Sequence, residues 1–128
     1  MIQKASRAAV ILLFLMASIF IIHKPAVAQQ PTLTLVNRSS LPALVRVKGP
    51  TKADVQVPGH SKKTIAVKGG NYFIKIRFGT NEKNYIYSKG QPFSVLETPT
   101  RIGHVTIIFN TTKGNYSTRP ISKREFWK

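Results

Sequence analysis

The chain has 128 residues, of which 20 are lysine or arginine and only four are aspartate or glutamate, so its formal net charge is +16. It contains no cysteine, which excludes disulfides, thiolate metal sites, thiol catalysis and lipid attachment through a cysteine. A charge of this size favours contact with anionic matter, but a basic soluble protein without an anionic target fits it equally well.

Residues 1–28 have the pattern of a secretory signal peptide. A positive n-region precedes an apolar run, Ala8–Ile22, whose 15 residues are fewer than the roughly 18 to 20 of a membrane-spanning helix. The small residues Ala26 and Ala28 suit a signal peptidase, so we expect cleavage between Ala28 and Gln29. An uncleaved N-terminal anchor is the alternative, and Lys24 close to the cleavage site favours it.

Cleavage at this site leaves 100 residues with a net charge of +13, because Lys4, Arg7 and Lys24 are removed with the signal. This length suffices for one β domain and leaves no room for a second. Small secreted animal domains are usually held by disulfides, so a cysteine-free exported domain fits a bacterium better. We therefore expect a periplasmic or secreted bacterial protein.

After the signal, short runs of β-branched and aromatic residues are separated by Gly, Pro, Asn and Ser. This pattern predicts an all-β domain over residues 29–110 and a basic C-terminal tail over residues 111–128. A single antiparallel β-sandwich of about seven to eight strands matches the number of runs, and a small β-barrel is the alternative. In chain order, the predicted strands span residues 32–38, 43–48, 54–57, 63–67, 72–78, 85–87, 93–96 and 103–110.

The clearest predicted hairpin joins the runs 63–67 and 72–78. Gly69 and Gly70 lie between them, and glycine suits the positive φ values of a tight turn. Alternation along the predicted strands also selects one apolar face in each. The predicted core consists of Leu33, Leu35, Val45, Val47, Val55, Val57, Ile65, Val67, Ile74, Ile76, Phe93, Val95, Val105, Ile107 and Phe109.

The tail, residues 111–128, is polar and basic, and this composition indicates a loosely held segment. Phe126 and Trp127 are the exception, because we expect a terminal pair of aromatic side chains to dock against the rest of the fold.

Several short motifs resemble those of small exported bacterial β-sandwich proteins. The general layout is similar to the immunoglobulin-like and carboxypeptidase-regulatory-like sandwiches that accompany bacterial surface proteins. The resemblance implies a fold and no catalytic residues. It is carried by Val36-Asn37-Arg38-Ser39, Val57-Pro58-Gly59-His60-Ser61, Gly69-Gly70-Asn71-Tyr72, Tyr85-Ile86-Tyr87-Ser88-Lys89-Gly90, Pro92-Phe93-Ser94-Val95, Gly114-Asn115-Tyr116, Arg119-Pro120 and Glu125-Phe126.

Candidate catalytic residues are sparse. Ser61 or Ser88 with His104 and Asp54 would make a hydrolase triad, but no Gly-x-Ser-x-Gly turn is present to expose a nucleophile. The carboxylates lie in separate segments, and the two histidines after residue 28 are too few for a zinc site. We therefore expect a non-enzymatic protein with no cofactor and no metal, and a hydrolase is the remaining alternative.

One set of cations shares a predicted sheet face. On the runs 43–48 and 72–78, apolar side chains alternate with basic ones, so the basic side chains point away from the core. The predicted hairpin adds Lys68 to the same face. Cations on such a face can bind anionic groups while the aromatic ring stacks on a sugar or base. The alternative is a solvated face whose charges prevent aggregation. The candidate anion- or partner-binding residues are Arg46, Lys48, Lys68, Phe73, Lys75 and Arg77.

These observations predict a binding or accessory module of the bacterial envelope. The expected partner is an anionic polymer, such as lipopolysaccharide or an acidic wall polymer, or else an acidic protein. Nucleic acid is a less favoured partner, and membrane contact is expected only through an uncleaved N-terminal segment. The alternative function is that of a structural subunit that packs into an envelope assembly through an edge strand or its aromatic tail.

Overall fold

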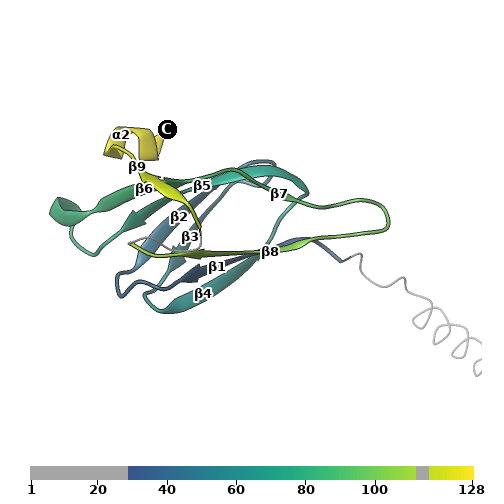
Figure 1. The fold of residues 1–128 in the computed structure, drawn as a ribbon, viewed down its shortest axis with the longest axis horizontal. Coiled ribbons are helices and arrows are strands. Elements are labelled where there is room, and N and C mark those ends of the chain that lie inside the picture. The colour runs from purple at the N-terminus through teal and green to yellow at the C-terminus, as the bar shows by residue number, and fades with distance from the viewer. Residues whose placement is uncertain (1–28, 112–115) are drawn as a thin grey trace, which may run out of the picture.

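The prediction of an all-β protein is confirmed. In the computed structural model, residues 29–111 and 116–128 are described, and they form nine strands, a short 3-10 helix and a short α-helix (Figure 1). The elements are β1 (Thr32–Asn37), β2 (Ala43–Lys48), β3 (Ala53–Val57), β4 (Ser61–Ala66), β5 (Gly70–Phe78), η1 (Glu82–Asn84), β6 (Ile86–Gly90), β7 (Phe93–Val95), β8 (His104–Phe109), β9 (Thr118–Pro120) and α2 (Lys123–Trp127).

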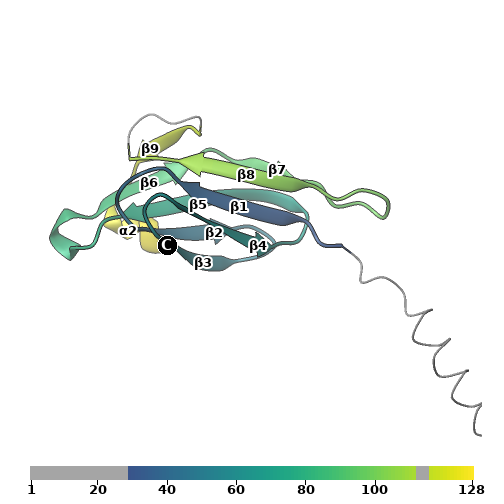
Figure 2. The same cartoon turned by 90° about the horizontal axis from the view of Figure 1, so that it is seen from below.

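The strands form two sheets. One has three strands in the order β4-β1-β8, and the other has six, in the order β3-β2-β5-β6-β9 with β7 also paired to β5 (Figures 1 and 2). Every described pair is antiparallel except β1 with β8, which is parallel. The expectation of a purely antiparallel arrangement is therefore wrong for this pair, because side-chain alternation reports which face a residue occupies and carries no information on strand direction.

A single apolar cluster lies between the two sheets, and the predicted core is confirmed. All fifteen predicted core residues belong to this cluster, either fully buried or packed against it. Tyr72 and Phe78 of β5 are also buried in the cluster, which makes β5 the most deeply embedded strand. The apolar positions alternate along each strand because successive side chains of extended chain point to opposite faces.

The predicted hairpin between residues 63–67 and 72–78 is wrong. β4 pairs with β1 and β5 pairs with β2, so the chain crosses from one sheet to the other at Gly69 and Gly70. A Cβ on Gly69 would lie 2.4 Å from the Cβ of Glu97, and Gly70 has a φ of +139°. The two glycines thus permit a close approach of backbone segments and a left-handed conformation at a crossover, rather than a tight turn within one sheet.

The expectation of a loosely held tail is wrong for residues 116–128. β9 pairs with β6 and so extends the six-stranded sheet beyond residue 110, and α2 packs on the outer face of that sheet. Ser122 caps α2, since its Oγ accepts a hydrogen bond of 3.1 Å from the Glu125 N–H. Phe126 is 0% exposed, so the prediction that the terminal aromatic residues dock is confirmed for this side chain.

The predicted signal segment, residues 1–28, lies outside the described residues. Across the described ranges 29–111 and 116–128, no helix has the length and apolar character needed to cross a membrane.

Candidate functional site

The outer face of the six-stranded sheet gathers cations from three neighbouring strands. In the register of β2, β5 and β6, Arg46 lies opposite Lys75, Lys48 lies opposite Phe73, and Lys75 lies opposite Lys89. Directly opposed residues point to the same side of a sheet with their Cβ atoms about 5 Å apart, so these side chains are immediate neighbours. We call this set, together with Arg77 on the same side of β5, the basic sheet face.

Five of the six predicted binding residues belong to the basic sheet face, and Lys68 does not. Lys68 is exposed at the crossover between the sheets, where its backbone N–H donates a hydrogen bond of 2.9 Å to Thr51 Oγ1. Its placement beside Lys75 depended on the predicted hairpin, and it fails for the same reason. Lys89 takes its place on the face, because β6 continues to Gly90 whereas the predicted strand ended at residue 87.

The C-terminal helix covers one half of the basic sheet face. Lys75 Nζ donates a hydrogen bond to the backbone carbonyl of Glu125, and Arg46 Nη1 donates one of 3.2 Å to that of Phe126. The guanidinium of Arg46 also lies 5.1 Å from the ring centroid of Trp127. Two cations thus meet the carbonyls at the end of α2, where the helix dipole is negative.

Aromatic rings complete this contact. The ring of Phe126 lies 5.3 Å from that of Tyr87, and the guanidinium of Arg77 lies 4.2 Å from the ring of Tyr85 and 5.8 Å from that of Trp127. Arg77 Nε is buried without a hydrogen-bond partner among the described residues, so its charge is held mainly by the rings. The sequence indicated that the aromatic pair docks, but it carried no signal for where.

Lys75 is buried among several other cations of the basic sheet face. The side chain is 5% exposed, and its burial, with added repulsion from Lys48, Lys89 and Arg46, lowers its pKa below 10.5; the Glu125 carboxylate opposes this shift. Burial is the larger cause of this lowered pKa, and the repulsion from three neighbouring cations against one neighbouring carboxylate adds to it.

The half of the basic sheet face that α2 does not cover contains two lysines without an ion-pair partner among the described residues. Arg46 Nε pairs with Asp54 at 3.1 Å, whereas Lys48 and Lys89 form no ion pair among the described residues. The ammonium of Lys89 lies 4.6 Å from the ring centroid of Phe73. That ring is half-buried and already contacts a cation on its face, so it positions Lys89 instead of standing open as a stacking platform.

Family models, curated proteins and solved structures show no match to this chain.

The residues of the considered hydrolase triad are each engaged elsewhere. Ser61 Oγ donates to the Gly59 carbonyl, His104 Nδ1 and Thr32 Oγ1 share a hydrogen bond of 2.7 Å, and Asp54 pairs with Arg46. Ser88 lies opposite Ile76, on the side of the sheet that faces the core. No three His, Asp or Glu side chains gather into a possible metal site within residues 29–111 and 116–128.

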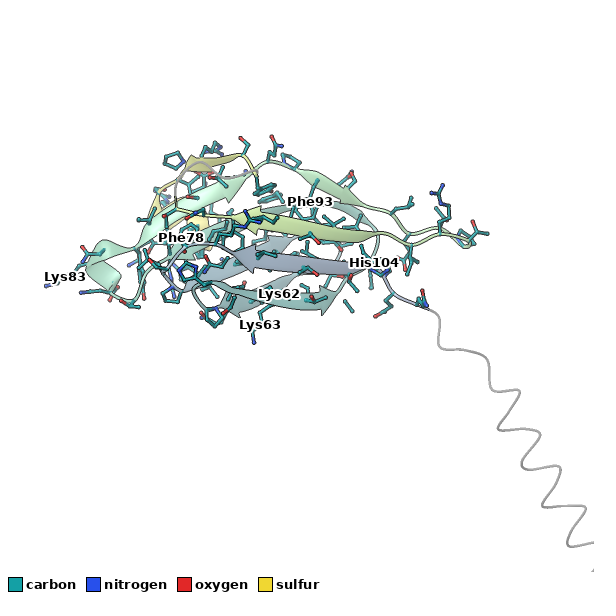
Figure 3. The ribbon with its side chains drawn as sticks, turned by 60° about the horizontal axis from the view of Figure 1, so that its bottom comes forward. Lys62, Lys63, Phe78, Lys83, Phe93 and His104 are labelled. Atoms are coloured by element: carbon teal, nitrogen blue, oxygen red, sulfur yellow. The ribbon has the colours of Figure 1, made fainter. Side chains whose placement is uncertain are left out.

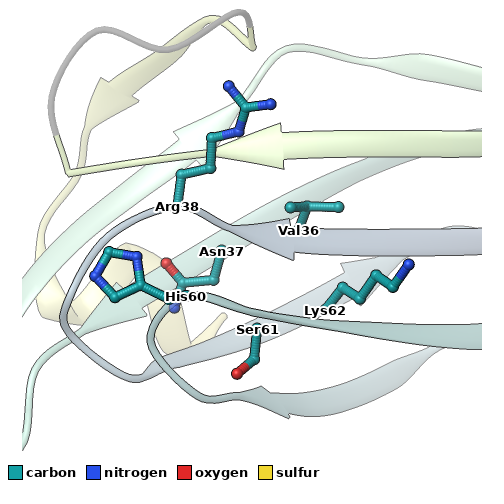
Figure 4. A pocket seen from close by; sticks show the side chains of 6 residues that line it. All are labelled: Val36, Asn37, Arg38, His60, Ser61 and Lys62. Carbon is teal, nitrogen blue, oxygen red and sulfur yellow. The ribbon is translucent and has the colours of Figure 1, made fainter.

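A second basic locality lies at one end of the three-stranded sheet. Residues Val36–Arg38 and His60–Lys62 line a hollow of 490 Å³ (Figure 4). The buried Asn37 amide donates to the carbonyls of Leu41, Val57 and Pro58, which fixes the loop behind the hollow. The basic side chains of Arg38, His60 and Lys62 spread in different directions in Figure 4, so the hollow has no single point at which an anion would meet all three.

Proposed function

We propose that this protein is a non-enzymatic, exported β-sandwich that binds an anionic polymer of the bacterial envelope through the basic sheet face. Lipopolysaccharide and acidic wall polymers have the required repeated negative charge, and an acidic protein surface presents the same chemistry. The observation that carries the proposal is the gathering of Lys48, Lys75 and Lys89 on one face of three adjacent strands, where Lys75 lies directly opposite Lys89 and Lys48 lies one row away, opposite Phe73. Among the described residues, no carboxylate pairs with Lys48 or Lys89.

An arrangement of this kind is costly unless an anion joins it. Like charges that oppose one another across a sheet are destabilising, and burial of Lys75 beside them adds the cost of removing a cation from water. A phosphate or carboxylate between Lys48 and Lys89 would be attracted by all three ammonium groups. The α2 carbonyl that holds Lys75 keeps this cation in place before a ligand arrives, which reduces the entropy lost on binding.

The sheet arrangement supports the sandwich over the small barrel. The two hydrogen-bonded sheets are separate and each ends in edge strands, whereas a closed barrel has none. An envelope location, periplasmic or secreted, follows from the signal-peptide pattern of residues 1–28. This architecture is the one implied by the resemblance to small exported bacterial sandwiches.

Chromatography on heparin or lipopolysaccharide beads over a salt gradient tests the proposal. The variant Lys48→Ser/Lys89→Ser removes the two lysines of the basic sheet face that make no contact with α2 among the hydrogen bonds and ion pairs of the described residues. The control Lys62→Ser/Lys63→Ser removes two exposed cations from β4 in the other sheet (Figure 3). Both variants change the net charge equally, so their difference isolates the basic sheet face. We expect the first to elute at clearly lower salt than the control. Elution of the two variants at the same salt concentration would contradict anion binding by the basic sheet face.

A structural subunit of an envelope assembly is the second candidate function. Phe126 is buried within its own chain and is not free to bind a partner, which leaves an edge strand as the surface for assembly. The edge strand β8 favours this candidate, because it pairs with β1 alone among the described strands and contains no lysine, arginine, aspartate or glutamate.

A further inference from the structure

Four cations of the six-stranded sheet form a single register row across its strands. Arg46 of β2 lies opposite Lys75 of β5, which lies opposite Lys89 of β6. Lys89 in turn lies opposite Arg119 of the edge strand β9. Neighbouring strands are about 4.8 Å apart and opposed residues point to the same side, so these charges follow one another at this interval across the sheet. We call these four residues the cation row.

The C-terminal helix lies on one side of the cation row. Arg77 and Tyr87 are opposed in the next row on the same face, where the ring of Phe126 packs against that of Tyr87. On the other side of the cation row, Lys48 is opposed to Phe73. Among the described residues, α2 forms no hydrogen bond, ion pair or ring contact with Lys48 or Phe73. A linear ligand can therefore approach the row from this side and lie across the strands, beside α2.

Internal carboxylates pair with both ends of the cation row. Asp54 pairs with Arg46 at 3.1 Å, and Glu125 of α2 pairs with Arg119 at 3.1 Å. The Arg119 side chain is 59% exposed, and a guanidinium has five donors, more than one carboxylate uses. Lys89 has no carboxylate partner among the described residues. An external anion at Lys89 thus meets no competing carboxylate, whereas at Arg119 it competes with Glu125.

A hollow of 330 Å³ adjoins this end of the cation row. Lys89 and Arg119 line it together with the polar residues Gln91 and Ser117. The Gln91 N–H donates a hydrogen bond of 3.1 Å to the Ser117 carbonyl, which continues the pairing of β6 with β9 by one residue. Carboxamide and hydroxyl groups both donate and accept hydrogen bonds, as sugar hydroxyls do. Ligand pockets span about 300–1,000 Å³, so this hollow suits a single sugar or polyol unit.

We propose that the cation row binds a linear, hydroxylated polyanion, which runs across the strands beside α2 and places one sugar or polyol unit in the hollow between Lys89 and Arg119. This inference rests on the proposed function and narrows it to polymers that carry repeated anionic groups on a hydroxylated chain, such as an acidic polysaccharide or a polyol phosphate. A run of acidic side chains offers carboxylates without the hydroxyls that match Gln91 and Ser117.

The affinity of the protein for a heparin oligosaccharide, measured over a salt series, tests the course of the ligand. Arg119→Ser removes the outer cation of the row. Arg101→Ser is the matched control, because this exposed arginine lies in the turn between β7 and β8 and its loss changes the net charge equally. We expect Arg119→Ser to reduce the slope of log affinity against log salt by about 1, and Arg101→Ser to leave it unchanged.

Glu125→Gln tests the competition at Arg119. The control is Glu82→Gln, since Glu82 pairs with Lys123 and both substitutions remove one negative charge. Glu125→Gln should bind the oligosaccharide about two- to fivefold more tightly than Glu82→Gln does. This gain should vanish when Arg119→Ser is also present, because the carboxylate acts through that guanidinium.

A comparison of ligands tests the hollow. Gln91→Ala should weaken binding of the heparin oligosaccharide and of a glycerol phosphate oligomer about threefold, and should not affect an oligoglutamate of equal charge. Binding of either hydroxylated ligand in this way supports the proposal, and the tighter one identifies the polymer class.

Three results would overturn the proposal: Arg119→Ser behaves like Arg101→Ser, Glu125→Gln behaves like Glu82→Gln, or the oligoglutamate binds as tightly as the hydroxylated ligands. The proposed function would survive any of these if binding still depended on Lys48 and Lys89, so the two proposals fail separately.

Discussion

Phe126 is the residue on which the attachment of the C-terminal helix depends. Its side chain is 0% exposed and contacts the rings of Tyr87 and Trp127, with centroids 5.3 Å and 4.9 Å away. Replacing a fully buried phenylalanine with alanine costs about 3–5 kcal/mol in well-packed cores. Because α2 has only five residues and can detach locally, we expect Phe126→Ala to cost about 3 kcal/mol, at the lower end of this range.

Urea denaturation of the wild type, Phe126→Ala and Trp127→Ala measures this effect. Trp127 lies in the same helix and is 47% exposed, so its truncation should cost only about 1 kcal/mol. Detachment of α2 would also return Lys75 to water, so its pKa should rise toward 10.5 in Phe126→Ala, as followed by the NMR shift of Nζ. Equal unfolding midpoints for the two variants, with an unchanged Lys75, would refute the docking of α2 described above.

Three further predictions concern single side chains. Burial raises the pKa of the Tyr116 phenol to about 12, so this group should favour the folded state below pH 10 and lose its contribution as the pH rises through about 12. Absorbance titration should show a late-ionising tyrosine that Tyr116→Phe removes. Because the pKa of Lys75 is lowered, the folded state binds the ammonium proton less tightly than the unfolded state does. The free energy of unfolding should therefore rise as the pH approaches 10.5, and Lys75→Met should flatten this rise. Gly69→Ala should cost about 1–3 kcal/mol because its Cβ would meet that of Glu97, and Glu97→Gly should recover part of this loss in a double-mutant cycle by thermal unfolding.

The fold class and the core were accessible from the sequence because both depend on alternation. A residue such as Ile76 is recognisable as buried from its spacing to Ile74 and from the cations on either side of it, Lys75 and Arg77, and no knowledge of its strand partners is needed. Strand pairing was not accessible in this way. Gly69 and Gly70 suit a hairpin turn and a crossover equally, and only tertiary packing against Pro50 and Glu97 decides between them.

The candidate site was predictable to the same extent. Arg46, Lys48 and Lys75 were found because each lies in a strand whose alternation is clear, whereas Lys68 was misplaced through the wrong hairpin. Lys89 was missed because its strand ends in a glycine, Gly90, two residues before a proline, Pro92, and this local sequence favours a turn. The docking of α2 on the basic sheet face could not be predicted, because Arg46 and Lys75 bind backbone carbonyls of the helix. Every residue has such a carbonyl, so the amino-acid sequence does not indicate which one a lysine will contact.

The most direct test of anion binding by the basic sheet face is an NMR titration of the backbone amides with a short heparin oligosaccharide. We predict the largest shifts at residues 47–48, 73–75 and 88–90, which surround Lys48 and Lys89 on β2, β5 and β6. Shifts concentrated on β4 and the hollow beside His60, or spread evenly over all exposed cations, would contradict the account.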